Sequence, residues 1–312
     1  MTSDVIDPCP PRRDHGQRTD DITSPLTRTG LREVPMPYVT SPADGTRLHY
    51  TDHGPVDGPV VVFVNGAYFG TGMWEFQTLP LAGEGVRCVG LDRRGHGRSD
   101  DVWDGYDLDT LADDLYGLLD HLDLREVTFV GHSLGSAEIV RCLTRHGTDR
   151  VARVAFVAGI APGVVRTADH PEGWDPEVMR AGRAVFRKDR AAFYEDGAAP
   201  YFALDVPGNE VSPHYVRHVV DQALACTPRA ADAVNRLVAT VDLAQELPKI
   251  GLPLLVVHGT HDTSAPLEAT GRRSAALVPG SVLKEYEGGG HGLYVTHADR
   301  LNADLRAFLA TS

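Results

Sequence analysis

The sequence has few cysteines, few lysines and no long hydrophobic run. Its four cysteines, Cys9, Cys88, Cys142 and Cys226, are widely spaced and form no Cys-x-x-Cys pair, so the sequence predicts neither a disulfide framework nor a cysteine metal site. The longest apolar runs, such as residues 60–64, are far too short to cross a bilayer. The first residues lack the basic and apolar segments of a secretory signal. We therefore expect reduced thiols in a cytoplasmic protein.

Positive charge is also scarce. The 312 residues contain 30 Lys and Arg, of which only three are Lys, against 43 Asp and Glu, and the formal net charge is −13. Such a chain is a poor candidate for binding nucleic acid or an anionic membrane through its overall charge. Nine aspartates and no Lys or Arg fall within residues 99–123, so we expect most of the net charge on the solvated face of one helix and in the loop before it.

Apolar segments and helical patterns alternate along most of the chain. Residues 59–65 and 252–258 are continuous apolar runs, as expected for strands that are buried on both faces of a sheet. In residues 107–122, leucines recur at helical spacing. Strands that alternate with helices in this way are typical of βαβ units, so the sequence predicts an α/β fold with a mostly parallel sheet.

This alternation divides the chain into three predicted parts. Residues 161–245 contain helix starts, two of them a capping residue followed by proline, but no clear strand, and we interpret them as a helical insertion. Residues 36–160 and 246–312 form the predicted α/β core on either side of the insertion. Residues 1–35 have no sustained apolar period and are predicted to be a mobile N-terminal arm.

The strongest motif is a Gly-x-Ser-x-Gly sequence, formed by Gly131, His132, Ser133, Leu134 and Gly135. It lies between an apolar strand and a helix, where a sharp turn lifts Ser133 clear of the sheet edge and the glycines allow close backbone packing. The start of the following helix favours negative charge that develops nearby. In this context the sequence predicts Ser133 to be a catalytic nucleophile.

A serine nucleophile needs a base and an acid that orients the base, and in this arrangement the acid and then the histidine follow the serine in the chain. Asp262 comes after the predicted strand at residues 252–258, and His291 lies in a glycine-rich loop after the next strand. We therefore predict that Ser133, Asp262 and His291 act as nucleophile, orienting acid and base.

Acyl transfer also needs two backbone N–H donors for the oxyanion. By position, one donor is the amide of Leu134, directly after the nucleophile, and the other is the amide of Ala67, in the loop after the strand at residues 59–65. Tyr68 and Phe69, in the same loop, are the predicted substrate contacts.

Residues 92–100 read Asp-Arg-Arg-Gly-His-Gly-Arg-Ser-Asp and resemble the DxRGxGxSD loop of α/β-hydrolase-fold enzymes. More narrowly, residues 131–154, 268–273 and 286–306 resemble the cofactor-free bacterial haloperoxidase/perhydrolase and esterase branch of that fold. This resemblance implies an α/β-hydrolase fold: a mostly parallel eight-stranded sheet with helices on both faces and a helical lid insertion over the serine. It also implies catalysis without metal, haem, flavin or any other cofactor.

The loop at residues 65–68 departs from the pattern of that branch. It reads Asn-Gly-Ala-Tyr, whereas the family usually has His-Gly followed by Trp or Phe and often by Pro. Ala67 thus replaces a bulky aromatic residue, and Tyr68 replaces the proline that is associated with perhydrolysis. These replacements weaken the case for peracid formation and imply a reshaped pocket.

The predicted function is a serine hydrolase that cleaves a carboxylic ester, thioester or lactone of modest size through an acyl-enzyme on Ser133. One alternative is another reaction on the same scaffold: perhydrolysis, C–C bond hydrolysis, or a biosynthetic cyclisation or acyl transfer. A less favoured alternative is a non-catalytic binding module. The 14 histidines include two His-x-x-x-His pairs without a third ligand, so no metal site is predicted. The predicted partner is a small-molecule acyl substrate, with no nucleic acid and no membrane.

Overall fold

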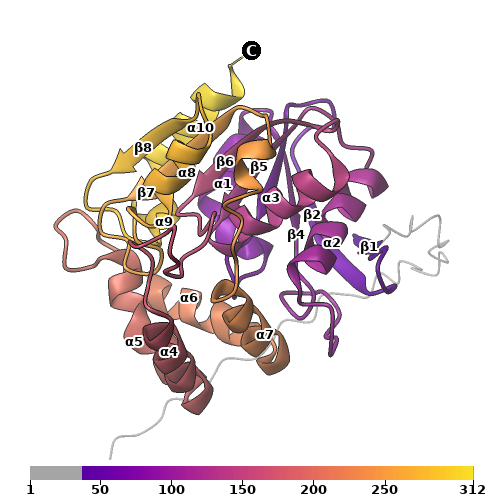
Figure 1. Ribbon diagram of the computed structural model, residues 1–312. Helices are drawn as coiled ribbons and strands as arrows, with labels where there is room; N and C mark the ends of the chain where they lie inside the picture. The colour runs from indigo at the N-terminus through magenta and orange to yellow at the C-terminus, as the bar shows by residue number, and fades with distance from the viewer. Residues whose placement is uncertain (1–36, 312) are drawn as a thin grey trace, which may run out of the picture. The chain divides into compact units, whose positions relative to one another are not determined.

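The structure is a computed structural model, and it describes residues 37–311 as an eight-stranded sheet with helices around it (Figure 1). The predicted N-terminal arm, residues 1–35, and Cys9 lie outside the described residues. The strands are β1 (Tyr38–Thr40), β2 (Arg47–His53), β3 (Val60–Val64), β4 (Arg87–Leu91), β5 (Val127–His132), β6 (Val151–Val157), β7 (Leu254–Gly259) and β8 (Val282–Tyr286).

The strands are arranged in the order β1-β2-β4-β3-β5-β6-β7-β8. β2 pairs antiparallel with β1 and with β4, and all the other neighbours are parallel. The predicted mostly parallel sheet is therefore confirmed, with eight strands as the family resemblance implies. β7 is buried along its whole length, which explains the continuous apolar run that predicts it.

Helices cover both faces of the sheet because successive crossovers run in opposite directions. The chain passes from β3 to β4 toward one edge through α1 (Glu75–Gly83), and from β4 to β5 toward the other edge through α2 (Leu108–His121). Right-handed crossovers in opposite directions place these two helices on opposite faces. α3 (Leu134–His146) packs beside α2, and the closing helix α10 (Ala298–Leu309) packs beside α1 (Figure 1). The short helices are η1 (Thr71–Trp74), η2 (Leu247–Lys249), α8 (Gly271–Leu277) and α9 (Leu293–Thr296).

The stretch at residues 161–245, predicted to be a helical insertion, contains four helices and no strand. The helices are α4 (Pro176–Lys188), α5 (Arg190–Phe202), α6 (Pro213–Ala225) and α7 (Pro228–Val238). α4, α6 and α7 each begin with proline after a capping residue: the side chains of Asp175, Ser212 and Thr227 accept a hydrogen bond from a backbone N–H of the first turn. Figure 1 shows these helices as a separate layer at one end of the sheet.

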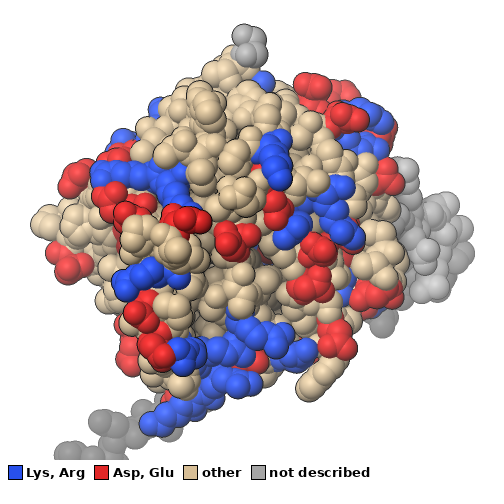
Figure 2. Space-filling model, viewed as in Figure 1, with Lys and Arg blue, Asp and Glu red and all other residues tan. Residues whose placement is uncertain are grey.

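The outer surface of this insertion is charged, whereas its inner surface is apolar. Figure 2 shows Lys and Arg side chains gathered over α4 and α7, where Arg180, Arg187, Lys188 and Arg236 are exposed. α4 also carries Phe186, which is buried. A helix of this kind packs its apolar face against neighbouring elements and leaves its charged face to solvent.

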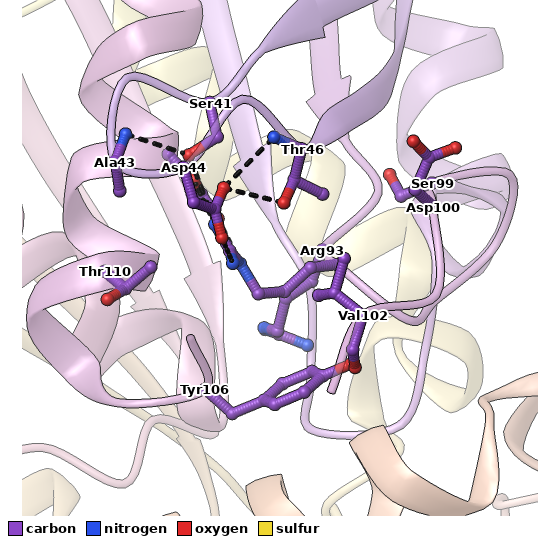
Figure 3. Close-up of polar contacts among 12 residues, drawn as sticks. Ser41, Ala43, Asp44, Thr46, Arg93, Ser99, Asp100, Val102, Tyr106 and Thr110 are labelled. Carbon is purple, nitrogen blue, oxygen red and sulfur yellow. Dashed lines mark hydrogen bonds and ion pairs between the residues drawn. The ribbon is translucent and has the colours of Figure 1, made fainter. Parts of the chain in front are cut away.

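Six of the nine aspartates of residues 99–123 are exposed, as we expect for a solvated helix face and the loop before it, and only Asp114 is buried. Asp114, on α2, is only 3% exposed and accepts two hydrogen bonds of 2.8 and 2.9 Å from Arg94. Arg94 is fully buried and also donates to Asp44. Asp44 in turn accepts hydrogen bonds from the backbone N–H and the hydroxyl of Thr46 (Figure 3). Four more of these aspartates pair with arginines of α3 or of the loop after it: Asp109, Asp113, Asp120 and Asp123. The negative charge of this segment is thus largely balanced by arginines elsewhere in the chain.

Candidate active site

Ser133 lies on a sharp turn between β5 and α3. Its backbone has φ 52° and ψ −118°, and a positive φ costs energy for a residue with a side chain. A Cβ atom on Gly135 would lie 2.4 Å from the carbonyl oxygen of Val64, so only glycine lets α3 approach β3 this closely. The Ser133 side chain makes no capping hydrogen bond to α3. The turn therefore leaves the hydroxyl free at the carboxyl edge of the sheet, as the Gly-x-Ser-x-Gly motif predicts.

Asp262 and His291 meet at the same edge, because each lies in the loop that follows one of two neighbouring parallel strands, β7 and β8. The Nδ1 atom of His291 lies 2.7 Å from Asp262 Oδ2, and both side chains are buried. The other carboxylate oxygen, Oδ1, accepts the backbone N–H groups of Ser264 and Ala265, both at 2.8 Å. Burial opposes ionisation of Asp262, but the neighbouring histidines hold its pKa well below the usual range. Asp262 is thus an ionised acceptor that fixes the ring of His291.

His258 is a further contact of the Asp262 carboxylate that the motif analysis did not identify. Its Nε2 atom lies 2.7 Å from the carbonyl oxygen of Ala265 and 3.3 Å from Asp262 Oδ2. His258 lies on β7, four residues before Asp262, and its side chain is fully buried. The carboxylate therefore lies between two imidazole rings, and the ring of His258 limits its rotation.

His132, the residue before the candidate nucleophile, supports His291 from the other side. Its Nε2 atom lies 3.0 Å from the backbone carbonyl oxygen of His291. Burial and the charge of His291 lower the pKa of His132 to about 3. The ring is therefore neutral at physiological pH and donates its Nε2 proton to this carbonyl. Only the tertiary structure brings this motif residue against the loop of His291.

The buried imidazole of His132 predicts that the fold loses stability in acid. In the unfolded chain this group takes up a proton near its ordinary pKa of 6.5, but in the folded protein only near 3. The unfolded state binds more protons between these values, so the free energy of unfolding falls as the pH is lowered through this window. We expect a contribution of about 1.4 kcal/mol per pH unit from this residue. His132→Gln should remove that slope in urea denaturation between pH 6 and pH 4, and an unchanged slope would contradict the assignment.

The loop after β3 holds the second predicted oxyanion donor. Ala67 and Leu134 are both buried, and neither backbone N–H has a hydrogen-bond acceptor within residues 37–311. Buried N–H groups without an acceptor are rare in folded proteins. The carbonyl oxygen of Ala67, by contrast, lies 2.8 Å from Nε2 of His96. Both N–H groups are thus available to a ligand.

Arg93 holds this loop in place through hydrogen bonds to two of the loop's carbonyl oxygens. The guanidinium donates to the carbonyl oxygen of Asn65 at 2.9 Å, to that of Gly66 at 3.1 Å and to the carboxylate of Glu138 at 2.7 Å. Arg93 and Glu138 are both buried, so each charge depends on the other for compensation. In the sequence, Arg93 is recognisable only as part of the motif at residues 92–100. In the structure, it positions the loop that carries the amide of Ala67.

A cavity of about 300 Å³ lies between the core and the insertion. Ser133 and His291 line it from the core, and Tyr68 and Phe69 line it from the loop after β3. Much of the remaining lining comes from the insertion and is aromatic or aliphatic: Trp174, Met179, Phe193, Tyr194, Tyr201 and Val219. The predicted nucleophile, base and substrate contacts thus line one cavity, whose volume is at the lower end of small-molecule sites.

Neither a metal-ligand cluster nor a membrane-spanning helix is present within residues 37–311. No group of three His, Cys, Asp or Glu side chains in this range could hold a metal ion. In the His-x-x-x-His pairs, His49 lies 3.0 Å from Asp92, and His218 lies 2.7 Å from Gln222. Nor is any helix of this range long and apolar enough to span a membrane.

Comparison with known proteins identifies the family. Residues 59–298 match the family model described as alpha/beta hydrolase fold. A non-heme chloroperoxidase from Kitasatospora aureofaciens is 38% identical over 276 residues, which cover 88% of this chain and 99% of that protein. A bifunctional esterase/perhydrolase from Acinetobacter calcoaceticus is 36% identical with the same coverage. The crystal structure of a bromoperoxidase from Bacillus anthracis matches with a TM-score of 0.83 at 32% identity, covering 88% of this chain and 99% of that chain. The chain therefore belongs to the α/β-hydrolase fold family, and it is a hydrolase enzyme similar to the haloperoxidase/perhydrolase and esterase branch that its motifs resemble.

Proposed function

We propose that this protein is a serine hydrolase that cleaves the carboxylic ester, thioester or lactone of a small molecule. The observation that carries the proposal is that Ser133, on a strained turn, shares one cavity with His291, whose Nδ1 atom lies 2.7 Å from the buried Asp262. The unpaired N–H groups of Ala67 and Leu134 add two donors. A nucleophile, a base, an orienting acid and oxyanion donors are the groups that acyl transfer requires.

In the first half of the reaction, the Oγ atom of Ser133 attacks the acyl carbonyl while Nε2 of His291 takes its proton. Asp262 keeps the remaining ring proton on Nδ1, which leaves Nε2 free to accept, and its negative charge stabilises the imidazolium. The N–H groups of Ala67 and Leu134 donate to the oxyanion of the tetrahedral intermediate. The intermediate then collapses as His291 gives its proton to the departing alcohol or thiol, and the acyl group stays on Ser133.

In the second half, water attacks the acyl-enzyme. His291 Nε2 takes a proton from the water, and the same two N–H groups hold the second oxyanion. Collapse of this intermediate breaks the bond to Ser133, which regains its proton from His291, and the carboxylic acid leaves. These steps use only protein groups and water.

We assign residues 161–245 the role of a lid over residues 36–160 and 246–312, which form the catalytic core. This assignment is supported by the cavity, which lies between the two parts of the fold. Tyr68 and Phe69, which line the cavity, are the proposed substrate contacts. A cavity of about 300 Å³ suits an acyl group of modest size.

A covalent probe tests the nucleophile directly. A fluorophosphonate reacts with an activated serine, so we expect one probe mass on the wild-type protein and none on Ser133→Ala, measured by intact-protein mass spectrometry. Ser264→Ala is the matched control, because Ser264 lines the same cavity; this variant should be labelled like the wild type. Labelling that persists in Ser133→Ala would overturn the assignment of the nucleophile.

Perhydrolysis is a second candidate, because one of the relatives is a bifunctional esterase/perhydrolase. In that reaction hydrogen peroxide replaces water in the attack on the acyl-enzyme and releases a peracid. Tyr68, in place of the proline associated with perhydrolysis, favours hydrolysis. Aryl esters, thioesters and lactones, each turned over with and without peroxide, separate the two reactions. Hydrolysis predicts carboxylic acid as the main product in both conditions, and peracid as the main product with peroxide would favour the second candidate.

A further inference from the structure

A hydrogen bond joins Tyr68 to the insertion at the wall of the cavity. The side-chain amide of Asn235, on α7, lies 2.7 Å from the Tyr68 hydroxyl through its Nδ2 atom. Both residues line the cavity that also holds Ser133 and His291. The ring of Tyr68 packs against Phe186 and Tyr194, at centroid distances of 5.8 and 5.0 Å. The hydroxyl therefore has a defined position within the acyl site.

The neighbours of Asn235 decide which way its amide points. Its Oδ1 atom lies 3.4 Å from Nη1 of Arg183, a group that only donates. Arg183 is itself held by Asp232, to whose carboxylate it donates two hydrogen bonds of 2.8 and 2.9 Å. If the amide were turned around, its NH₂ group would face the guanidinium, donor against donor. The amide oxygen therefore faces Arg183, and the NH₂ group donates to Tyr68.

This orientation of the amide leaves the O–H of Tyr68 without a hydrogen-bond acceptor within the described residues. The phenol oxygen accepts from Asn235, and the Tyr68 O–H has no acceptor within residues 37–311. Burial raises the pKa of Tyr68 to about 12, so the proton stays on the oxygen at physiological pH. Burying a polar group that has no hydrogen-bond partner costs free energy. A ligand oxygen that accepts a hydrogen bond from the Tyr68 O–H would replace the bond lost to water.

We propose that the Tyr68 hydroxyl is a polar anchor that selects acyl groups carrying a neutral oxygen acceptor, such as an ether, ketone or hydroxyl oxygen, at a distance from the scissile carbonyl. This inference rests on the proposed hydrolase function and names a substrate class for the same site. The acyl side is favoured over the alcohol side because Tyr68 directly follows Ala67, whose amide is the proposed donor to the acyl carbonyl oxygen. The otherwise apolar lining accepts the rest of the chain.

An oxygen scan along the acyl chain tests the proposal. The substrates are p-nitrophenyl hexanoate and three analogues in which an ether oxygen replaces the third, fourth or fifth carbon. For each ester, kcat/KM relative to hexanoate is measured in the wild type and in Tyr68→Phe, so that intrinsic reactivity cancels between the two enzymes. We expect at least one ether ester to lose about five- to tenfold in this ratio when the hydroxyl is removed, as a neutral hydrogen bond would give.

Arg183→Met tests the orientation argument without touching the hydroxyl. Without the guanidinium, the amide of Asn235 is free to turn its oxygen toward Tyr68 and accept a hydrogen bond from the phenol O–H. We expect this variant to lose the ether preference as Tyr68→Phe does. Asp232 remains paired with Arg187, whose Nε atom lies 2.9 Å away, so the substitution leaves no isolated carboxylate. Full retention of the preference in Arg183→Met would overturn the proposed orientation.

Tyr201→Phe is the matched control, because it removes from the same cavity lining a tyrosine hydroxyl that already donates to Tyr294 at 3.2 Å, and it should leave the ether preference unchanged. Tyr194→Phe tests the competing hydroxyl of this lining, which is buried and also has no hydrogen-bond partner within residues 37–311. Equal ratios in the wild type and Tyr68→Phe for all three ether esters would overturn the anchor, as would a preference that only Tyr194→Phe abolishes. A parallel series with the oxygen in the alcohol part addresses the acyl assignment, and a preference confined to that series would overturn it. Failure of the hydrolase proposal is distinguishable: hexanoate would then not be turned over, or turnover would survive in Ser133→Ala.

Discussion

Replacing Asp262 by Asn is expected to lower kcat for ester hydrolysis about 10⁴-fold while leaving the fold intact. Oδ1 of Asp262 accepts the backbone N–H groups of Ser264 and Ala265, so the oxygen of an asparagine would take that place. Its NH₂ group would then face Nδ1 of His291, which lies 2.7 Å from Oδ2 in the native protein. A donor at this point forces the ring proton onto Nε2, and the histidine is then unable to take the proton of Ser133.

The measurement is kcat with p-nitrophenyl acetate, together with urea denaturation to show that the variant is folded. Asp304→Asn is the matched control: Asp304 is also a hydrogen-bonded carboxylate, which accepts from Lys284 and Tyr286 at 2.6 Å, but it lies on α10 and does not line the cavity. This control should keep kcat within about twofold of the wild type, as a residue outside the reacting groups would. A folded Asp262→Asn variant with kcat within tenfold of the wild type would show that Asp262 is not the orienting acid.

Arg93→Met is expected to lower the free energy of unfolding by about 3–5 kcal/mol, because it leaves the buried carboxylate of Glu138 without its partner. It also removes the donors to the carbonyl oxygens of Asn65 and Gly66. Burial raises the pKa of Glu138, so part of the loss is relieved when the isolated group takes up a proton. The loop that carries the Ala67 amide should loosen as well, and activity should fall with stability.

Urea denaturation measures the loss, and an exposed ion pair provides the control. The pair of Arg47 and Asp100 has the same charges at 3.0 Å, but the two side chains are 63% and 38% exposed. Arg47→Met should therefore cost much less stability than Arg93→Met, because solvent screens an exposed ion pair. Arg93→Met combined with Glu138→Leu removes both buried charges and should recover part of the lost stability. If Arg93→Met lowered the free energy of unfolding no more than Arg47→Met does, the Arg93–Glu138 pair would not hold the loop in the way described.

The candidate site could be predicted to the extent that its residues belong to local patterns. Ser133 comes directly after a strand, and Asp262 and His291 lie in the loops that follow two others. Strand ends are visible in the sequence as the limits of apolar runs. In a parallel sheet these ends meet at one edge, so the order of the three residues was enough to expect them together. The motif spacing likewise indicated Ala67 and Leu134, since a backbone donor depends on position and not on side chain.

Other contacts of the site join residues whose sequence carries no sign of the partner. Asn235 and Tyr68 are 167 positions apart, and His132 and the carbonyl of His291 are 159 apart. Neither pair belongs to a repeated spacing, because each contact forms only when distant parts of the chain meet in the fold. Asp114 departs from the expected solvated face of α2 for the same reason, because it is buried in an ion pair with Arg94.

By itself, the sequence determined the alternation of strands and helices and the all-helical stretch at residues 161–245, and it predicted the candidate nucleophile, acid and base. These features follow from hydrophobic periodicity, helix capping and backbone turns, which act over a few neighbouring residues. The tertiary structure alone decided how charges are paired, which way the amide of Asn235 points and which side chains line the cavity. Burial and hydrogen-bond geometry depend on residues that the chain brings together from distant positions, and they set the pKa values and the unpaired donors that give the site its proposed chemistry.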